Sequence, residues 1–372
     1  AGRLMPRDVP PPECGIVRPV RVHGVGTLNR RTVEKPWKDR SLTIIGPQFK
    51  GFPEGELETC PPVEYQSYVA GSWSPDSGPP TPAALPRWAY RVLDFGTNLT
   101  GFIGVRVRCA APARLMLAFD ELVPDQGPVN WMRLHCANLV ELRLDAGECE
   151  FETIEPYTLR ALQAAAVEGE VELLDVWLRE FAASGTRRAR LRASDPAVER
   201  VFEAGRQTFR QNAVDLFMDC PSRERAGWLC DSFFTARSAL DLQGHTRLER
   251  AFLENFALPE RFAHLPEGML PMCYPSDHYN GQFIPNWAMW FVLELREYLE
   301  RSGDRELVER LRPRVLKLVE FFHRLRNSDG LLERLPSWVF VEWSAANKFV
   351  QDVNHPSNML YAEMLDAVAE LY

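Results

Sequence analysis

The chain has 372 residues, of which 45% are hydrophobic and 25% charged, a composition typical of a folded protein with a large core. A formal net charge of −8, without any run of Lys or Arg, argues against a nucleic-acid-binding protein. No apolar stretch approaches the roughly 20 residues that a membrane-spanning helix needs, so no membrane partner is expected. No signal peptide is recognisable, which leaves the cytoplasm, the periplasm and secretion open as locations, and the oligomeric state is unknown.

The N-terminal half has the pattern of a β protein. Residues 1–89 are rich in Pro and Gly with short apolar alternations, which favour short strands and long loops. Regular strand runs with frequent turn residues follow over 90–185 and predict an antiparallel β-sandwich. These runs lie at 91–96, 101–108, 114–119, 139–144, 151–154, 164–167 and 171–178. We interpret residues 186–193 as a linker.

After Ser194 the hydrophobic period changes from two to 3.6, which predicts helices over 194–372. Ser194-Asp195-Pro196 makes a typical helix start, with the Ser194 hydroxyl as the cap and Pro196 near the first turn. Pro313 is expected to end or kink the fifth of the later helices. Further helices are expected at about 231–243, 247–257, 286–301, 304–325 and 357–372. Successive helices without intervening strands indicate a bundle, a solenoid or a toroid.

Between two of these helices, residues 219–231 read Asp-Cys-Pro-Ser-Arg-Glu-Arg-Ala-Gly-Trp-Leu-Cys-Asp. Glycosidic cleavage needs one protonated carboxyl and one carboxylate, and crowding of carboxylates keeps one of them protonated. Asp219, Glu224 and Asp231 are three carboxyl groups close enough in the sequence to form such a crowded set. The alternative is structural: Asp219 ends a helix, Glu224 pairs with a neighbouring arginine, and Asp231 caps the next helix. Spacing alone does not decide between the two.

Tryptophans favour a sugar ligand. Trp228 lies in the same segment, Trp287 opens a later helix and Trp343 lies in a loop-like stretch. An aromatic face can stack on the apolar face of a sugar ring, and core packing is the alternative for each residue. The seven histidines show no HxxxH or HExxH spacing, and no nucleotide-binding motif occurs. We therefore expect neither a metal site nor a cofactor.

The segment 219–231 resembles the signature of bacterial α-L-rhamnosidases, glycoside hydrolase family 78, which commonly reads Asp-Cys-Pro-x-Arg-Glu-Arg-x-Gly-Trp-x-Gly-Asp. Residues 94–102 resemble that family's Asp-Phe-Gly-Gln-Asn-x-x-Gly-Trp strand, and Glu342-Trp343 resembles a later Asp-Trp pair. The resemblance covers roughly residues 90–372. It implies a β-sandwich followed by an (α/α)6 toroid, which we expect to be incomplete in this chain.

The resemblance also implies inverting hydrolysis of terminal α-L-rhamnosyl or related deoxysugar linkages. Glu224 matches the general acid of the family. Its substrate-binding positions correspond here to Asp219, Arg223, Trp228, Asp231, Trp287, Glu342 and Trp343. The general base of the family, a Glu on a late helix, is expected beyond Tyr372.

Two positions depart from the family pattern. Leu229-Cys230 stands where the family usually has Thr-Gly, and Glu342 stands where it usually has Asp. Both departures concern the exact sugar more than the reaction type. Other classes remain open: a carbohydrate-binding protein without activity, and a different toroid enzyme such as a polysaccharide lyase or a sugar epimerase.

Overall fold

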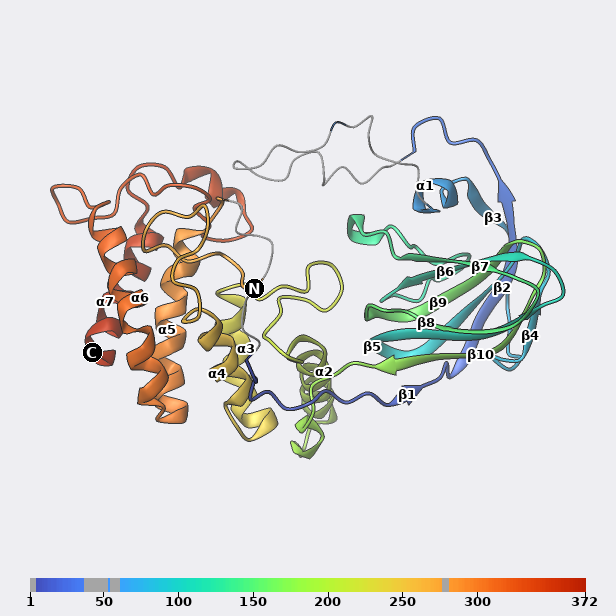
Figure 1. Ribbon diagram of the computed structural model, residues 1–372, viewed down its shortest axis with the longest axis horizontal. Helices are drawn as coiled ribbons and strands as arrows, with labels where there is room; N and C mark the ends of the chain where they lie inside the picture. Colours follow the sequence, from blue (N-terminus) through green and yellow to red (C-terminus); the bar gives the residue numbers. More distant parts are fainter. Residues whose placement is uncertain (1–4, 37–52, 54–60, 276–280) are drawn as a thin grey trace.

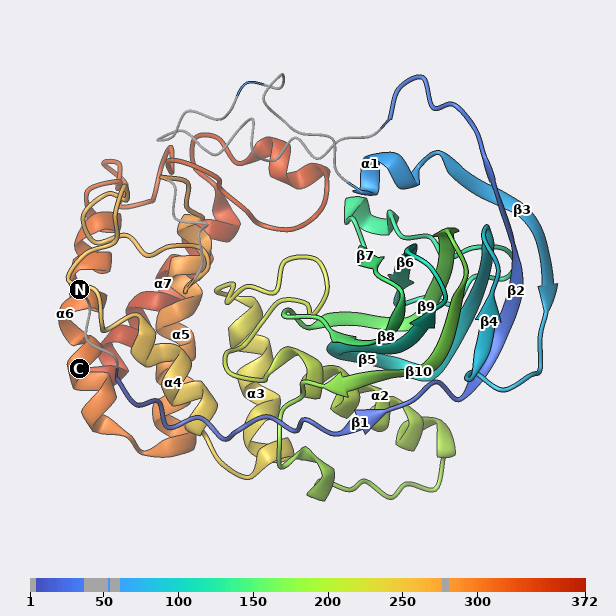
Figure 2. The same cartoon turned by 45° about the vertical axis from the view of Figure 1, so that its right-hand side comes forward.

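A computed structural model describes residues 5–36, 53, 61–275 and 281–372. The strands gather in one part of the molecule and the helices that follow them gather in the other (Figure 1). The chain segment between α2 and α3, yellow-green in both views, lies between these two parts (Figure 2).

Within the described residues, the first part is a single antiparallel sheet of ten strands, accompanied by the short helix α1 (Pro61–Tyr65). Its central path runs β1-β10-β5-β9-β6-β7, and β2, β3, β4 and β8 pair off this path. The strands are β1 (Ile16–Val17), β2 (Arg21–Arg30), β3 (Tyr68–Pro75), β4 (Ala83–Leu85), β5 (Ala89–Cys109), β6 (Ala113–Asp120), β7 (Leu139–Leu144), β8 (Gly147–Glu152), β9 (Tyr157–Glu168) and β10 (Val171–Glu180). Strands from before and after residue 89 therefore share one sheet.

The long strand β5 makes this connectivity possible. Its first half lies between β2 and β9, while its second half lies between β10 and β8. The change of partner falls at an irregularity between Asp94 and Leu99, where the buried Asp94 accepts from the Gly96 N–H at 2.8 Å and from Arg21 and Arg160. The sequence predicted two strands here; that was wrong, because the irregularity bends the strand without ending it.

Alternation along the strands buries two apolar faces. Leu115 and Leu117 of β6 belong to one core, and Met116 and Ala118 belong to another on the opposite face. This period of two is what the sequence pattern predicted for the strands.

Six helices follow Ser194 in the described part of the chain, as the hydrophobic period predicted. They are α2 (Pro196–Asn212), α3 (Asp231–Gln243), α4 (Arg247–Asn255), α5 (Pro285–Ser302), α6 (Arg305–His323) and α7 (His355–Leu371). Short 3-10 turns lie before these helices at Arg133–His135 and Thr186–Arg188, and between α6 and α7 at Ala345–Phe349. Asp195 caps α2 by accepting from the Ala197 N–H at 2.8 Å, so the prediction that the Ser194 hydroxyl is the cap was wrong by one residue. None of the described helices is long and apolar enough to cross a membrane.

Pro313 does not end its helix: α6 continues through it to His323. Of the two expected outcomes, an end at Pro313 is wrong, and a kink there stays a prediction. Pro313 is exposed, so the backbone bond that it removes lies on the solvent side of the helix, where water can satisfy the freed carbonyl.

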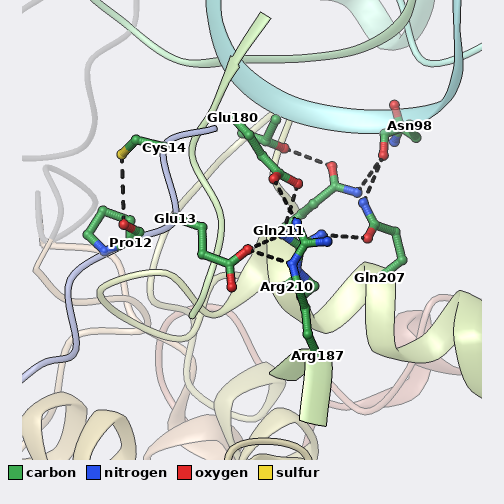
Figure 3. A network of polar contacts seen from close by, with 10 residues as sticks. Pro12, Glu13, Cys14, Asn98, Glu180, Arg187, Gln207, Arg210 and Gln211 are labelled. Carbon is green, nitrogen blue, oxygen red and sulfur yellow. Dashed lines mark hydrogen bonds and ion pairs between the residues drawn. The ribbon is translucent and has the colours of Figure 1, made fainter. Parts of the chain in front are cut away.

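Buried polar contacts join the sheet to α2 (Figure 3). Arg210 of α2, with 4% of its side chain exposed, contacts Glu13 at 2.9 Å and Glu180 of β10 at 3.0 Å. On the same helix, Gln207 and Gln211 both donate to the carbonyl oxygen of Asn98, at 3.2 and 2.8 Å. One polar network therefore joins Glu13, the sheet and α2.

We expect Arg210→Ala to lower the free energy of unfolding by about 2 kcal/mol. The change leaves the Glu180 carboxylate buried with a weaker partner, because Arg187 remains at 3.5 Å. Urea unfolding measures the effect. Arg206→Ala is the matched control, since Arg206 on the same helix pairs with a half-exposed Glu203. Equal losses in the two variants would contradict a stabilising role for the buried network.

Candidate functional site

The loop between α2 and α3 contains the segment 219–231 and is fixed by backbone pairing. The Leu229 N–H donates to the Met272 carbonyl at 2.9 Å, and the Tyr274 N–H donates to the Gly227 carbonyl at 3.0 Å. A Cβ on Gly227 would lie 2.6 Å from the Tyr274 carbonyl oxygen. Glycine is therefore required here for the close approach of two backbones.

A tight turn presents Glu224. Asp219 closes the turn reciprocally with Ala226: the Asp219 N–H donates to the Ala226 carbonyl, and the Ala226 N–H donates to Asp219 Oδ1, both at 3.2 Å. Glu224 is partly exposed at the tip, and its Oε1 accepts from Arg223 at 2.5 Å. The ion pair that sequence reasoning weighed as an alternative is thus present. Half of the Arg223 side chain is exposed, so the pair contributes little to stability.

Asp231 is the first residue of α3 and does not cap it, because the cap position falls on Cys230. The structural alternative that made Asp231 the capping residue is therefore off by one position. Burial, together with the negative charges of Asp219 and then Glu224, raises the pKa of Asp231 to about 6. The loop therefore brings all three predicted carboxylates within electrostatic reach of one another.

Asp231 lies in a pocket of about 420 Å³ with aromatic walls. Among the predicted residues, Asp231, Trp287 and Trp343 line it. The other lining residues are Cys230, Phe234, Asn286, Trp290, Phe340, Val341, Pro356 and Leu360. The pocket is thus made by the starts of α3, α5 and α7 and by the segment before the Ala345–Phe349 turn.

A chain of edge-to-face ring contacts holds the aromatic wall. Trp228 packs on Trp287 with centroids 5.2 Å apart, Trp287 packs on Phe340 at 5.5 Å, and Phe340 packs on Trp343 at 5.0 Å. Trp343 is 82% exposed, whereas Trp228 is 7% exposed and stands behind Trp287. Trp343 and Trp287 are therefore placed to meet a ligand, and Trp228 supports them from behind.

Other predicted residues lie outside the pocket lining. Asp219, Arg223 and Glu224 stand on the turn beside the pocket, while Glu342 is exposed and accepts from the Ser344 hydroxyl at 2.6 Å. The polar and aromatic sequence Asp277-His278-Tyr279, which favours a loop and could also line a pocket, lies outside the described residues.

Sequence reasoning missed Phe340 and Asn286. Asn286 is buried, donates to Ser357 at 2.7 Å and accepts from the Phe340 N–H at 3.2 Å, so it ties α5 and α7 to the aromatic segment. Pro285 was an available signal for the position of Asn286, because proline favours the first position of a helix and so marks where α5 begins.

A buried carboxyl group beneath the site was also missed. Glu294 of α5 is fully buried and accepts from the Ser232 hydroxyl at 2.6 Å. Ser232 directly follows Asp231 in the sequence. Burial raises its pKa to about 8, so it is largely protonated at neutral pH. In the sequence it lies within an apolar helix pattern, which gave no signal of this role. No group of three His, Cys, Asp or Glu side chains suited to a metal occurs within the described residues.

Cys230 has φ 75° and ψ −51°, a conformation that strains any residue with a Cβ. We expect Cys230→Gly to raise the free energy of unfolding by about 1 kcal/mol and to widen the pocket that Cys230 lines. Thermal unfolding measures the gain. Cys149→Gly is the control: Cys149 lies exposed in β8, so the same change there should destabilise the protein. A loss of stability in both variants would contradict the claim that the backbone at Cys230 is strained.

A family model described as the bacterial alpha-L-rhamnosidase 6 hairpin glycosidase domain matches residues 186–371, which is half of the chain. A curated α-L-rhamnosidase from Streptomyces avermitilis is 23% identical over 257 residues, covering 68% of this chain. This chain spans 24% of that protein's length.

Solved structures share the fold. A family 78 rhamnosidase of Bacillus sp. GL1 has a TM-score of 0.71 at 20% identity, covering 81% of this chain and 32% of its own. A Klebsiella oxytoca rhamnosidase, solved with rhamnose bound, has a TM-score of 0.66 at 19% identity and covers 96% of this chain and 66% of its own. The antiparallel sheet with its following helices is thus a shared architecture.

Proposed function

The chain belongs to the bacterial α-L-rhamnosidase six-hairpin glycosidase family, and on this basis we propose that the protein hydrolyses terminal α-L-rhamnosyl or related deoxysugar linkages with inversion. We propose further that residues 90–185 form most of a β-sandwich domain, to which the β-rich region 1–89 adds the strands β1 to β4. The linker 186–193 would lead to an α/α toroid over 194–372, to which the six described helices after Ser194 would contribute. The start of the family match at residue 186 supports this division.

One observation carries the proposal: Asp231, within electrostatic reach of Asp219 and Glu224, lines a pocket whose walls include tryptophan rings. A hexose ring has an apolar face that stacks on an aromatic side chain and hydroxyls that a carboxylate can accept from. Trp287 and Trp343 would take the face, and Asp219 and Asp231 would accept from the hydroxyls. This arrangement suits a terminal sugar that enters the pocket end-on.

Glu224 would act as the general acid that protonates the leaving oxygen. It stands at the tip of its turn, partly exposed, beside the pocket and not in its floor. That is where the bond to the departing group would lie when the terminal ring fills the pocket. Arg223 pairs with Glu224 from an exposed position, so a bound substrate can displace it at small energetic cost. Inversion also requires a base on the opposite face of the sugar.

Aryl α-L-rhamnosides test the proposal, assayed with the protein in its natural full length. We expect release of L-rhamnose that appears first as the β-anomer by NMR, because inversion changes the anomeric configuration. Binding of L-rhamnose without release would favour a carbohydrate-binding protein. An unsaturated product absorbing in the ultraviolet would favour a lyase. Release of the α-anomer first would contradict the inverting course.

A further inference from the structure

A chain of buried hydroxyl and amide groups leads from the sheet to the turn that carries Glu224. The Thr158 hydroxyl of β9 donates to the carbonyl oxygen of Pro221 at 2.6 Å. Thr158 Oγ1 lies 2.8 Å from Thr100 Oγ1 of β5, and the Thr100 hydroxyl contacts Gln211 Oε1 of α2 at 2.8 Å. Thr158, Thr100 and Gln211 are each less than 5% exposed. Water therefore does not compete for these bonds.

The number of hydroxyl protons fixes the direction of the hydrogen bond between Thr158 and Pro221. The Pro221 carbonyl can only accept, and Gln211 presents its Oε1 to Thr100 because its Nε2 donates to the Asn98 carbonyl at 2.8 Å (Figure 3). Each threonine has one hydroxyl proton, so Thr158 donates to Pro221, and the one proton of Thr100 is shared between two acceptors, Gln211 Oε1 and Thr158 Oγ1. The Thr158 proton is thus committed to the turn.

We propose that Thr158 is a positioning residue for the general acid, a proposal that rests on the proposed function. Its bond holds Pro221 at the first position of the turn that ends in Glu224. The Glu224 N–H is in turn held by Cys220 Sγ at 3.4 Å. The sheet thereby fixes where the acid stands relative to a sugar ring held by α3, α5 and the aromatic wall.

The two halves of the site are therefore held by different parts of the protein. The pocket is lined by residues of the helical part, whereas the acid-bearing turn is bonded to β9. Asp219 keeps its own pair with Ala226 and does not depend on Thr158. Loss of the Thr158 hydroxyl should thus affect proton transfer more than sugar binding, because small displacements of a reacting group cost rate steeply.

The test is Thr158→Val in the protein in its natural full length, with Thr158→Ser as the conservative variant. We expect Val to lower kcat for an aryl α-L-rhamnoside about tenfold with little change in KM. Ser keeps the hydroxyl and should stay within about twofold of the unaltered protein. Thr153→Val is the matched control, because buried Thr153 donates at 2.8 Å to the Glu155 carbonyl within the sheet part.

Hydrogen exchange separates this proposal from the proposed function. Amides of residues 220–225 should exchange faster in Thr158→Val than in Thr158→Ser or Thr153→Val, whether or not the protein hydrolyses rhamnosides. If the unaltered protein releases no sugar, the proposed function fails. The exchange result still tests whether the Thr158–Pro221 bond holds the turn. Unchanged exchange in Thr158→Val, or a serine variant as impaired as the valine variant, would overturn the proposal.

Discussion

Replacing Glu224 by Gln should lower the turnover of an alkyl α-L-rhamnoside by about 10²–10⁴-fold. The amide keeps the shape of the side chain but has no acidic proton for the leaving oxygen. Folding should be unaffected, because the bond that is lost joins Glu224 to a half-exposed Arg223. Initial rates on the natural full-length protein, with circular dichroism as the folding check, measure the effect.

The leaving group makes the test specific. A dinitrophenyl rhamnoside departs without protonation, so Glu224→Gln should lose much less activity on it than on the alkyl substrate. Glu203→Gln is the matched control, since Glu203 also pairs with a nearby arginine but lies on α2 outside the pocket lining. Near-unaltered turnover of the alkyl substrate in Glu224→Gln would remove Glu224 from the acid role.

Asp231→Asn should weaken L-rhamnose binding about 10- to 100-fold and at the same time stabilise the protein at neutral pH. The raised pKa means that the folded state holds its proton more tightly than the unfolded chain, where an Asp has its ordinary value near 3.8. The free energy of unfolding therefore falls as the pH rises from about 4 to about 6. Asn has no charge to bury and escapes this loss.

The expected stability gain of Asp231→Asn is about 1–2 kcal/mol at pH 7 and close to zero near pH 3, after allowance for partial exposure. Urea unfolding across this pH range measures it, as the difference between the variant and the unaltered protein. Asp241→Asn, an exposed position on the same helix, controls for the amide itself. If the stability gain of Asp231→Asn grew as the pH fell, the claim that burying the Asp231 charge costs stability would be contradicted.

Much of the fold followed from periodicity. The predicted helices at 231–243 and 286–301 differ from α3 and α5 by at most one residue at each end. Pro285 at the start of α5, and Gly244 and Gly303 after the two C-termini, mark helix ends locally. The strand β5 was less visible. Its middle carries an irregularity stabilised by Arg21 and Arg160, and neither contact is local in sequence.

The candidate site was predicted as a set of residue types, without its geometry. The carboxylates of 219–231 were recognisable because so many charges in a connector are unusual. Phe340 and Asn286 act through contacts with distant segments, which no local pattern records. The strain at Cys230 was also hidden, because it depends on a backbone angle.

A structure of the natural full-length protein carrying Glu224→Gln, with an uncleaved α-L-rhamnoside bound, tests the central assignment most directly. The expected result is a terminal ring between Trp287 and Trp343, with hydroxyls bonded to Asp219 and Asp231 and the glycosidic oxygen beside position 224. A ring bound elsewhere, or one whose hydroxyls avoid both aspartates, would contradict the assignment of this pocket as the rhamnosyl site.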